Sequence, residues 1–286
     1  MIVAATVTPK KVPSVEKRKL VLAADADWLP ISGRTRVKDG SALDFSFLLD
    51  APAGKYGFAC AGRNGELVFE RRPEVPVRLY GCNLCFEANF PSDKALIDAM
   101  VDDFARLGYN IVRFHHYDGR LLKRGGGYME LDAKKLDAMD YAFAQMKRRG
   151  IYATMDLFIH RDANLWPVKG YEGEKVDRGS HKALIWAHEG FNRQFVDYAL
   201  ALLTHVNPYT GLKWGEDPAL IDIDCVNEDA VSWTVHGKYA KPVYERLFGE
   251  WIARTGVSAA ELVADRPRQW NRFLVDFYPE IGRAHV

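Results

Sequence analysis

Hydrophobic and polar positions follow two alternating patterns along residues 76–226. Short apolar runs predict four buried strands, at Val77–Leu84, Tyr109–Phe114, Ile151–Phe158 and Leu220–Val226. Between these runs, apolar residues recur every three or four positions, which predicts amphipathic helices over 93–107, 136–146 and 191–206. Strand therefore alternates with helix four times, which indicates a parallel α/β sheet covered by helices.

The boundaries of the helices are marked by capping and breaking residues. Ser92 or Asp93 is expected to begin the first helix, because a short polar side chain satisfies free backbone N–H groups there. Gly108 and Gly150 are expected to end the first two helices. After the fourth strand, further helical stretches are predicted at 244–253, 258–264 and 270–277.

Residues 1–75 have a different character and are expected to form an N-terminal extension with a small β-rich segment. Met1–Leu20 contains several lysines and a proline and indicates a lead-in; its apolar run is too short for a signal peptide. Ala42–Leu48 alternates apolar and polar residues, which predicts a strand. Tyr56–Cys60 and Glu66–Glu70 flank a glycine-containing segment, which predicts a hairpin. The α/β domain is then expected over residues 76–279.

Composition excludes several classes of function. The chain has 286 residues, of which 48% are hydrophobic, and a formal net charge of +1. A near-neutral charge provides no electrostatic footprint for nucleic acid or an anionic membrane. No apolar run reaches the ~18 residues that a spanning helix needs. We therefore expect a globular protein with neither nucleic-acid nor membrane partners, and the compartment stays open.

The cysteines and glycines do not indicate a cofactor. Cys82 and Cys85 have the spacing of half a zinc site or a redox pair, but no second pair at matching spacing accompanies them. Cys82 also lies in a predicted buried strand, where cysteine acts as a small hydrophobic residue. No glycine-rich phosphate loop follows the first strand of the α/β domain, which disfavours a nucleotide site. No cofactor or metal is expected.

Every predicted strand of the α/β domain ends in polar residues. In parallel α/β folds, working residues lie at the carboxyl ends of the strands. The candidates are Asn83, Arg113, His115, His116, Asp156, His160, Asn227 and Glu228. Strand alternation predicts that Arg113 and His115 share one face. Each residue alone has a structural explanation: Arg113 as the partner of a buried carboxylate, and Asn227-Glu228 as a helix N-cap followed by a first-turn acid. The four polar strand ends together favour a functional site at this edge of the sheet. The alternation of strands and helices fits both a doubly wound sheet and a barrel.

Several segments resemble one family of enzymes. Asn227-Glu228 at the end of the fourth strand resembles the acid/base signature of clan A glycoside hydrolases. Leu43–Tyr56, Tyr80–Pro91, Val112–Asp118 and Leu203–Gly211 resemble bacterial cellulase-family, family 5-like glycosidases, and the resemblance covers residues 27 to 278. It implies a (β/α)8 TIM-barrel fold, of which residues 76–279 supply the first four to five βα units. It also implies a carbohydrate substrate and a retaining two-carboxylate mechanism acting on β-linked sugars.

The resemblance also assigns roles to residues. Glu228 would protonate the glycosidic oxygen and later activate water. Asn227 would hydrogen-bond the sugar 2-hydroxyl, and Arg113 would hold the nucleophile carboxylate ionised. The expected substrate-binding residues are His115, His116, His160, Asn83 and Trp233, the last as a stacking surface that equally fits ordinary packing. The resemblance does not indicate which sugar is bound, or whether action is exo or endo.

The chain departs from the family pattern in one respect. A retaining glycosidase needs two carboxylates about 5 Å apart, and the family places its nucleophile on a seventh strand. Only four strands are predicted, so we expect a C-terminally truncated fragment with weak or no activity. Residues 280–286 can be back-translated into codons that contain the start of a sequencing adapter, which predicts a non-native tail of a metagenomic fragment. An open sheet edge would also favour pairing of two copies.

Two other functions fit the sequence. A carbohydrate-binding protein on a non-catalytic barrel would need the same aromatic and hydroxyl-binding groups without a second carboxylate. A metal-dependent barrel hydrolase would use His115, His116, His160 and Asp156. Adjacent histidines on a strand face opposite ways and make a poor chelating pair, and no His-x-His motif occurs.

Overall fold

The computed structural model describes residues 26–27, 36–229 and 231–283. The chain divides into two compact units, Met1–Arg36 and Val37–Val286, and the fold described below is that of the second unit. The predicted lead-in Met1–Leu20 and residues 284–286 of the predicted tail lie outside the described residues. The predicted domain boundary at residue 75 and the non-native origin of the tail stay predictions.

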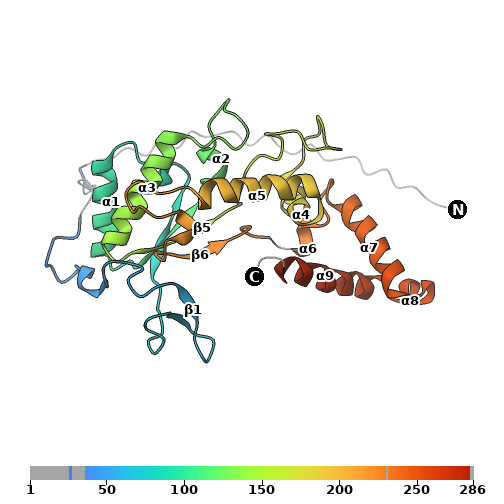
Figure 1. Cartoon of the computed structure of the whole chain (residues 1–286), viewed down its shortest axis with the longest axis horizontal. Helices are drawn as coiled ribbons and strands as arrows, with labels where there is room; N and C mark the ends of the chain where they lie inside the picture. Colours follow the sequence, from blue (N-terminus) through green and yellow to red (C-terminus); the bar gives the residue numbers. More distant parts are fainter. Residues whose placement is uncertain (1–25, 28–35, 230, 284–286) are drawn as a thin grey trace. The chain divides into compact units, whose positions relative to one another are not determined.

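A parallel sheet forms the centre of this unit. Its neighbours follow chain order: β3 (Gly81–Cys85), β4 (Ile111–His115), β5 (Tyr152–Asp156) and β6 (Leu220–Asp224). Three connecting helices lie on one side of this sheet (Figure 1): α1 (Lys94–Arg106), α3 (Ala133–Arg148) and α5 (Glu189–Leu203). A doubly wound sheet reverses its strand order and carries helices on both faces. The arrangement is therefore that of successive βα units of a (β/α)8 barrel, as predicted, although the sheet formed by the described residues does not close.

The two faces of the sheet differ in polarity. Val112, Phe114 and Met155 point toward the helices and are fully buried, in one cluster with Ile97 of α1 and Phe143 of α3. Burial of each such side chain contributes roughly 1.5–3 kcal/mol. The other face is polar, because strand alternation turns the intervening residues there. One register row joins Asn83, Arg113, Thr154 and Asp222, and in the next row Cys85 pairs with His115 and Asp156 with Asp224.

Local signals in the sequence set the helix ends. The side chain of Asp93 caps α1 by accepting a hydrogen bond of 2.6 Å from the backbone N–H of Ala95. Asp132 caps α3 by accepting from the N–H groups of Lys134 and Lys135. Gly108 and Gly150 follow these helices with φ of +73° and +81°, a region that favours glycine. The helix boundaries predicted at Asp93, Gly108 and Gly150 are confirmed.

The N-terminal part of the unit is only partly as predicted. The hairpin is confirmed as the antiparallel pair β1 (Ala59–Ala61) and β2 (Leu67–Phe69). The strand predicted at 42–48 is wrong: a turn there leads into the 3-10 helix η1 (Ser46–Leu48). The carboxylate of Asp44 accepts 3.0 Å hydrogen bonds from the N–H groups of Gly40 and Ser46, which favours a turn over an extended strand.

The long helix predicted over 191–206 is shorter at its C-terminal end. It is preceded by a separate helix, α4 (Arg178–Ala187), and α5 itself ends at Leu203. Val206 was expected on its apolar face but lies beyond its end, is 50% exposed and forms a bridge with Lys213. The Thr204 hydroxyl donates to the Leu200 carbonyl at 2.6 Å, which satisfies one of the last carbonyls of the helix.

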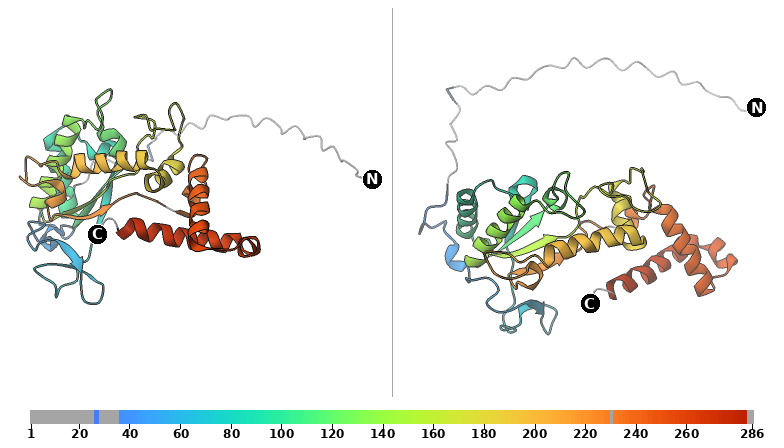
Figure 2. Two further views of the ribbon diagram at one scale, coloured as in Figure 1. Left: turned by 45° about the vertical axis from the view of Figure 1, so that its right-hand side comes forward. Right: turned by 45° about the horizontal axis from the view of Figure 1, so that its top comes forward.

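Helices follow β6 to the end of the described region. They are α6 (Val231–Thr234), α7 (Lys241–Thr255), α8 (Ala259–Ala264) and α9 (Arg266–Arg283), and the last three confirm the predicted stretches. A second apolar cluster joins α4 to α7 and α9, and Figure 2 shows α7 beside α4. Shorter elements are η2 (Phe86–Asn89), α2 (Asp118–Leu121) and η3 (Trp214–Glu216). Within the described ranges, no helix combines the length and apolar character that crossing a bilayer requires.

Candidate active site

Arg113 joins three strands at the carboxyl edge of the sheet. Its guanidinium donates hydrogen bonds to both carboxylate oxygens of Asp156, with Nε–O distances of 3.1 and 3.2 Å. It also donates to Asp224 Oδ2 at 2.9 Å and to Asn227 Oδ1 at 3.1 Å. Strand register explains this convergence, since Asp156 and Asp224 are paired residues of β5 and β6. Arg113 therefore lies at the centre of a charged cluster, the Arg113 cluster, formed by Arg113, His115, Asp156, Asp224 and Asn227.

His115 completes the Arg113 cluster. Its Nδ1 lies 2.6 Å from Asp156 Oδ2, and the Asp156 side chain is fully buried. Arg113 and His115 therefore contact the same carboxylate, which confirms the prediction that they share one face. This carboxylate fixes the position of both side chains, because a buried charge is stable only when its oxygens are hydrogen-bonded.

Asp224 was not among the predicted site residues. Its pKa is raised to about 6, first by burial and then by the neighbouring carboxyl of Asp156, while Arg113 opposes the shift. Two adjacent carboxylates beside one guanidinium favour retention of a proton. The sequence contained a signal for this residue: alternation along Leu220–Asp224 places Asp222 and Asp224 on one face.

Asn227 and Glu228 follow β6 at the same edge. The Asn227 side chain is buried, and Arg113 fixes the orientation of its amide, because a guanidinium can only donate hydrogen bonds and so must face the oxygen. Its amide nitrogen therefore remains a donor. Glu228 is exposed and has a φ of +51°, in the left-handed region that residues other than glycine rarely adopt. Such outliers cluster at functional sites.

His116 and His160 lie at a neighbouring cavity. The cavity has a volume of about 500 Å³, and its lining includes His116, His160, Phe86, Arg120 and Lys135. The rings of His116 and Phe86 stack with centroids 4.7 Å apart, and both residues have positive φ, at +51° and +55°. Burial lowers the pKa of His116, and the nearby His115 and His160 lower it further. His116 is therefore disposed to be neutral at pH 7.

The loop that carries His160 is held by a buried carboxylate that sequence reasoning missed. Asp118 Oδ2 accepts hydrogen bonds from the backbone N–H groups of Ile159, His160 and Arg161, at 3.0, 3.1 and 3.0 Å. The His160 ring is exposed and contacts the guanidinium of Arg178 in α4. Nothing in the local sequence pattern distinguishes Asp118 from an ordinary helix-start acid.

The other two predicted substrate-binding residues, Asn83 and Trp233, belong neither to the Arg113 cluster nor to the lining of the neighbouring cavity. Asn83 is exposed on β3 at the position paired with Arg113. Trp233, on α6, is 53% exposed, and a Cβ placed at Gly179 of α4 would lie 3.0 Å from its ring. Within the described part of the chain, neither side chain hydrogen-bonds to the cluster. Trp233 rests on α4, so its role in stacking stays a prediction.

The residues considered for a metal do not converge. Among the described residues, no group of three His, Cys, Asp or Glu side chains is arranged to hold a metal ion. His115 binds Asp156, whereas the ring of His116 stacks on Phe86. Cys82 and Cys85 lie three residues apart on β3, so they point to opposite faces, and both are free thiols.

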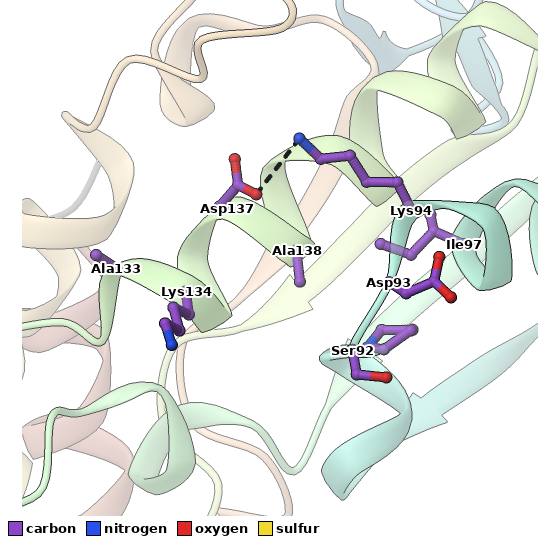
Figure 3. A pocket seen from close by; sticks show the side chains of 9 residues that line it. Ser92, Asp93, Lys94, Ile97, Ala133, Lys134, Asp137 and Ala138 are labelled. Atoms are coloured by element: carbon purple, nitrogen blue, oxygen red, sulfur yellow. Dashed lines mark ion pairs between the residues drawn. The ribbon is translucent and has the colours of Figure 1, made fainter.

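Another cavity lies beside the sheet, between α1 and α3. It has a volume of about 540 Å³ and is lined by Asp93, Lys94, Lys134 and Asp137, among others (Figure 3). Lys94 and Asp137 form an ion pair across it at 3.6 Å. None of the predicted site residues lines this cavity. The Arg113 cluster with its neighbouring cavity is therefore the better candidate for an active site.

Comparison with known proteins finds similar solved structures. No protein-family model and no curated protein matches the chain. Similar solved structures include an endo-1,4-beta-mannanase from Rhizomucor miehei, at 16% identity over 60% of this chain and 48% of that one, with a TM-score of 0.43. They also include a glycoside hydrolase family 5 mannosidase from the same organism, at 16% identity, 66% and 54% coverage and a TM-score of 0.43.

An endo-beta-1,4-mannanase from Thermotoga petrophila is similar at 17% identity over 62% of this chain and 40% of its own, with a TM-score of 0.39. This chain spans about half the length of these solved structures. Glycoside hydrolase family 5, which the sequence resemblance indicated, is thus also represented among the structural neighbours.

Proposed function

We propose that this chain carries half of the active site of a glycoside hydrolase, with Glu228 as the catalytic acid/base. The observation that carries the proposal is the convergence of Asp156, Asp224 and Asn227 on the Arg113 guanidinium. Glu228 follows directly after Asn227, at the carboxyl edge where parallel α/β folds place their chemistry. Its exposed carboxyl is available to a substrate there.

The proposed reaction is retaining hydrolysis of a β-linked oligo- or polysaccharide. Glu228 donates a proton to the glycosidic oxygen as the bond to the anomeric carbon breaks, and a second carboxylate attacks that carbon. Glu228 then removes a proton from water, which displaces the carboxylate. The amide nitrogen of Asn227, oriented by Arg113, donates to the sugar 2-hydroxyl. His116 and His160 line the cavity that accepts the neighbouring sugar.

The proposal requires a second carboxylate about 5 Å from Glu228. Asp156 and Asp224 are the acids of the Arg113 cluster, and both are engaged by that guanidinium. A nucleophile from a further strand would meet the same cationic group, which would stabilise its ionised form. We therefore expect weak or no turnover by these residues alone, and pairing of copies through the sheet edges stays a prediction.

The test is an assay of the chain against aryl β-glycosides, β-glucans and β-mannans. Glu228→Gln is compared with Glu216→Gln, a matched change of an exposed glutamate in η3. We expect any turnover to fall by a factor of about 10² or more in Glu228→Gln and to persist in Glu216→Gln. Turnover that survives Glu228→Gln would contradict the assignment of the acid/base.

Binding is measured alongside turnover, by calorimetry with oligosaccharides from the same polymers. Binding without turnover, weakened by His116→Ala, would support a carbohydrate site in this chain, and it is expected both of half of a glycosidase site and of a carbohydrate-binding protein. Neither binding nor turnover by any sugar would count against a carbohydrate site in this chain.

A further inference from the structure

One face of α4 carries three N–H donors that contact the loops of the candidate site. Arg178, Lys182 and Trp186 are four residues apart, so they lie in one row along the helix. Together they form what we call the α4 donor row. The row contacts the loop after β5 through Arg178 and the turn after β6 through Lys182 and Trp186.

Lys182 is the central member of the row. It is a lysine that is only 3% exposed, and its Nζ donates to the backbone carbonyl of Asn227 and, at 3.5 Å, to that of Glu228. Burial lowers the pKa of Lys182, while the negative charges of Glu228 and Asp229 oppose this shift. A buried ammonium is costly unless its hydrogens are bonded, so these carbonyls and Lys182 hold each other in place.

Trp186 and Arg178 extend the contact on either side of Lys182. The indole N–H of Trp186 donates to Asp229 Oδ2, and burial raises the pKa of the Asp229 carboxyl. Arg178 contacts the ring of His160 through its guanidinium. The row therefore reaches both sides of the site, at the turn of the proposed acid/base and at the proposed sugar-binding histidine.

α4 is itself firmly placed. Asp177 caps its first turn by accepting from the N–H of Ser180 at 2.9 Å, and the Ser180 hydroxyl accepts from the N–H of Tyr239 at 3.1 Å. The hydroxyl of Tyr244 donates to the Ala183 carbonyl at 3.0 Å, and Ala183 is fully buried. The helix is therefore a rigid support rather than a mobile cover.

The turn that the row contacts has an unfavourable backbone conformation. Glu228 has a φ of +51°, which costs roughly 1–3 kcal/mol for a residue other than glycine and persists only when its surroundings impose it. The carbonyls immediately before and after this φ angle are the two that accept from Lys182. A single side chain thus bridges both peptide groups of the left-handed residue.

From this geometry we infer that the α4 donor row is a positioning device for the site, in which Lys182 and Trp186 impose the left-handed conformation of Glu228 and so aim its carboxyl. The inference rests on the proposed function for its catalytic consequence. The effect of Lys182 and Trp186 on the backbone of Glu228 depends only on their contacts and is measured separately.

The experiment measures the backbone of residues 227–229 by NMR in the whole chain. Lys182→Met removes the ammonium and keeps the length of the side chain, Lys182→Arg keeps a donor, and Trp186→Phe removes only the indole N–H donor and part of the ring. Lys134→Met, an exposed lysine of α3, is the matched control. The one-bond Cα–Hα coupling of Glu228 reports the sign of φ, and the resonances of His115 report the rest of the site.

We expect Lys182→Met to shift Glu228 to negative φ, with the resonances of His115 unchanged. Lys182→Arg should restore positive φ, and Lys134→Met should have no effect. Retention of positive φ in Lys182→Met would overturn the inference. If Lys182→Met does not fold, Trp186→Phe decides by the same coupling: a shift of Glu228 to negative φ supports the row, and retained positive φ overturns it.

Activity provides the second readout where turnover is found. Lys182→Met should lower kcat about tenfold or more and leave KM within about twofold. The reason is that a displaced Glu228 carboxyl weakens proton transfer but leaves binding of the substrate in the ground state intact. Turnover with unchanged kcat would overturn the positioning role. An absence of both sugar binding and turnover in every variant, with the NMR changes observed, would count against the proposed function and leave the conformational role of the row established.

Discussion

Nδ1 of His115 lies 2.6 Å from Oδ2 of the buried Asp156. The same carboxylate binds the guanidinium of Arg113, so two cationic or potentially cationic side chains share one acceptor. Asp156 is therefore the acid of the Arg113 cluster that contacts both Arg113 and His115.

Removal of the Asp156 carboxylate should destabilise the fold. Breaking a buried ion pair from one side costs about 3–5 kcal/mol, and Arg113 is 29% exposed, so we expect the low end for Asp156→Ala. Urea denaturation of Asp156→Ala beside Asp222→Asn, an exposed acid of the same sheet face, measures the difference. Equal stability of the two variants would show that Asp156 does not anchor the cluster.

Asp224 should make stability depend on pH. Its pKa is raised to about 6 from 3.8, by burial and by Asp156, while Arg113 opposes the shift and Asp222 adds to it. As the pH rises, the Asp224 carboxyl therefore loses its proton at a lower pH in the unfolded chain than in the folded one. The contribution of Asp224 to folding stability, fully present below about pH 4, is lost as the pH rises through about 6.

Asp224→Asn cannot ionise, and its Tm should exceed that of the unchanged chain above pH 6. The difference should disappear below about pH 4, where Asp224 is protonated in both states. Thermal unfolding across pH 3.5–8 checks this, with Asp222→Asn as the control on the same strand. A constant Tm difference across the range would rule out Asp224 as the titrating group.

Asp118 should control the loop that carries His160. Its carboxylate accepts from three consecutive N–H groups and lies 3.7 Å from the Arg161 guanidinium. Asp118→Ala should lower the free energy of unfolding by about 3 kcal/mol and speed amide exchange at residues 159–161. Asp162→Ala, an exposed neighbour, should leave those amides protected. Unchanged exchange in Asp118→Ala would contradict this role.

Trp214 should contribute to the helix-covered side of the sheet through both packing and a hydrogen bond. It is fully buried, and its indole N–H donates to Asp140 Oδ1 at 2.7 Å, while His205 Nε2 lies 2.7 Å from Asp140 Oδ2. We expect Trp214→Phe to cost about 2–4 kcal/mol of unfolding free energy. The exposed Trp233→Phe should change it by less than about 0.5 kcal/mol. Similar changes in unfolding free energy for Trp214→Phe and Trp233→Phe would contradict the stabilising role of Trp214.

The four strands and the helices α1, α3 and α5 between them were predictable, because their residues carry the signal locally. Val112 and Phe114 alternate with Arg113 and His115, so one face of β4 had to be apolar and the other polar. Asp93 as a cap and Gly108 as a stop acted through backbone chemistry within a few residues. The strand predicted at 42–48 failed for a local reason as well, since the hydrogen bonds of Asp44 favour a turn.

The sequence by itself determined which residues stand at the strand ends, and it named Arg113, His115, Asn227 and Glu228 as candidates. Only the tertiary structure decided their partners. Strand order and register brought Asp156 and Asp224 to Arg113 from positions 43 and 111 residues away. Packing of α4 brought Lys182 to the carbonyls of Asn227 and Glu228, 45 and 46 residues away. Such contacts depend on which elements become neighbours, and periodicity within one element contains no information about that choice.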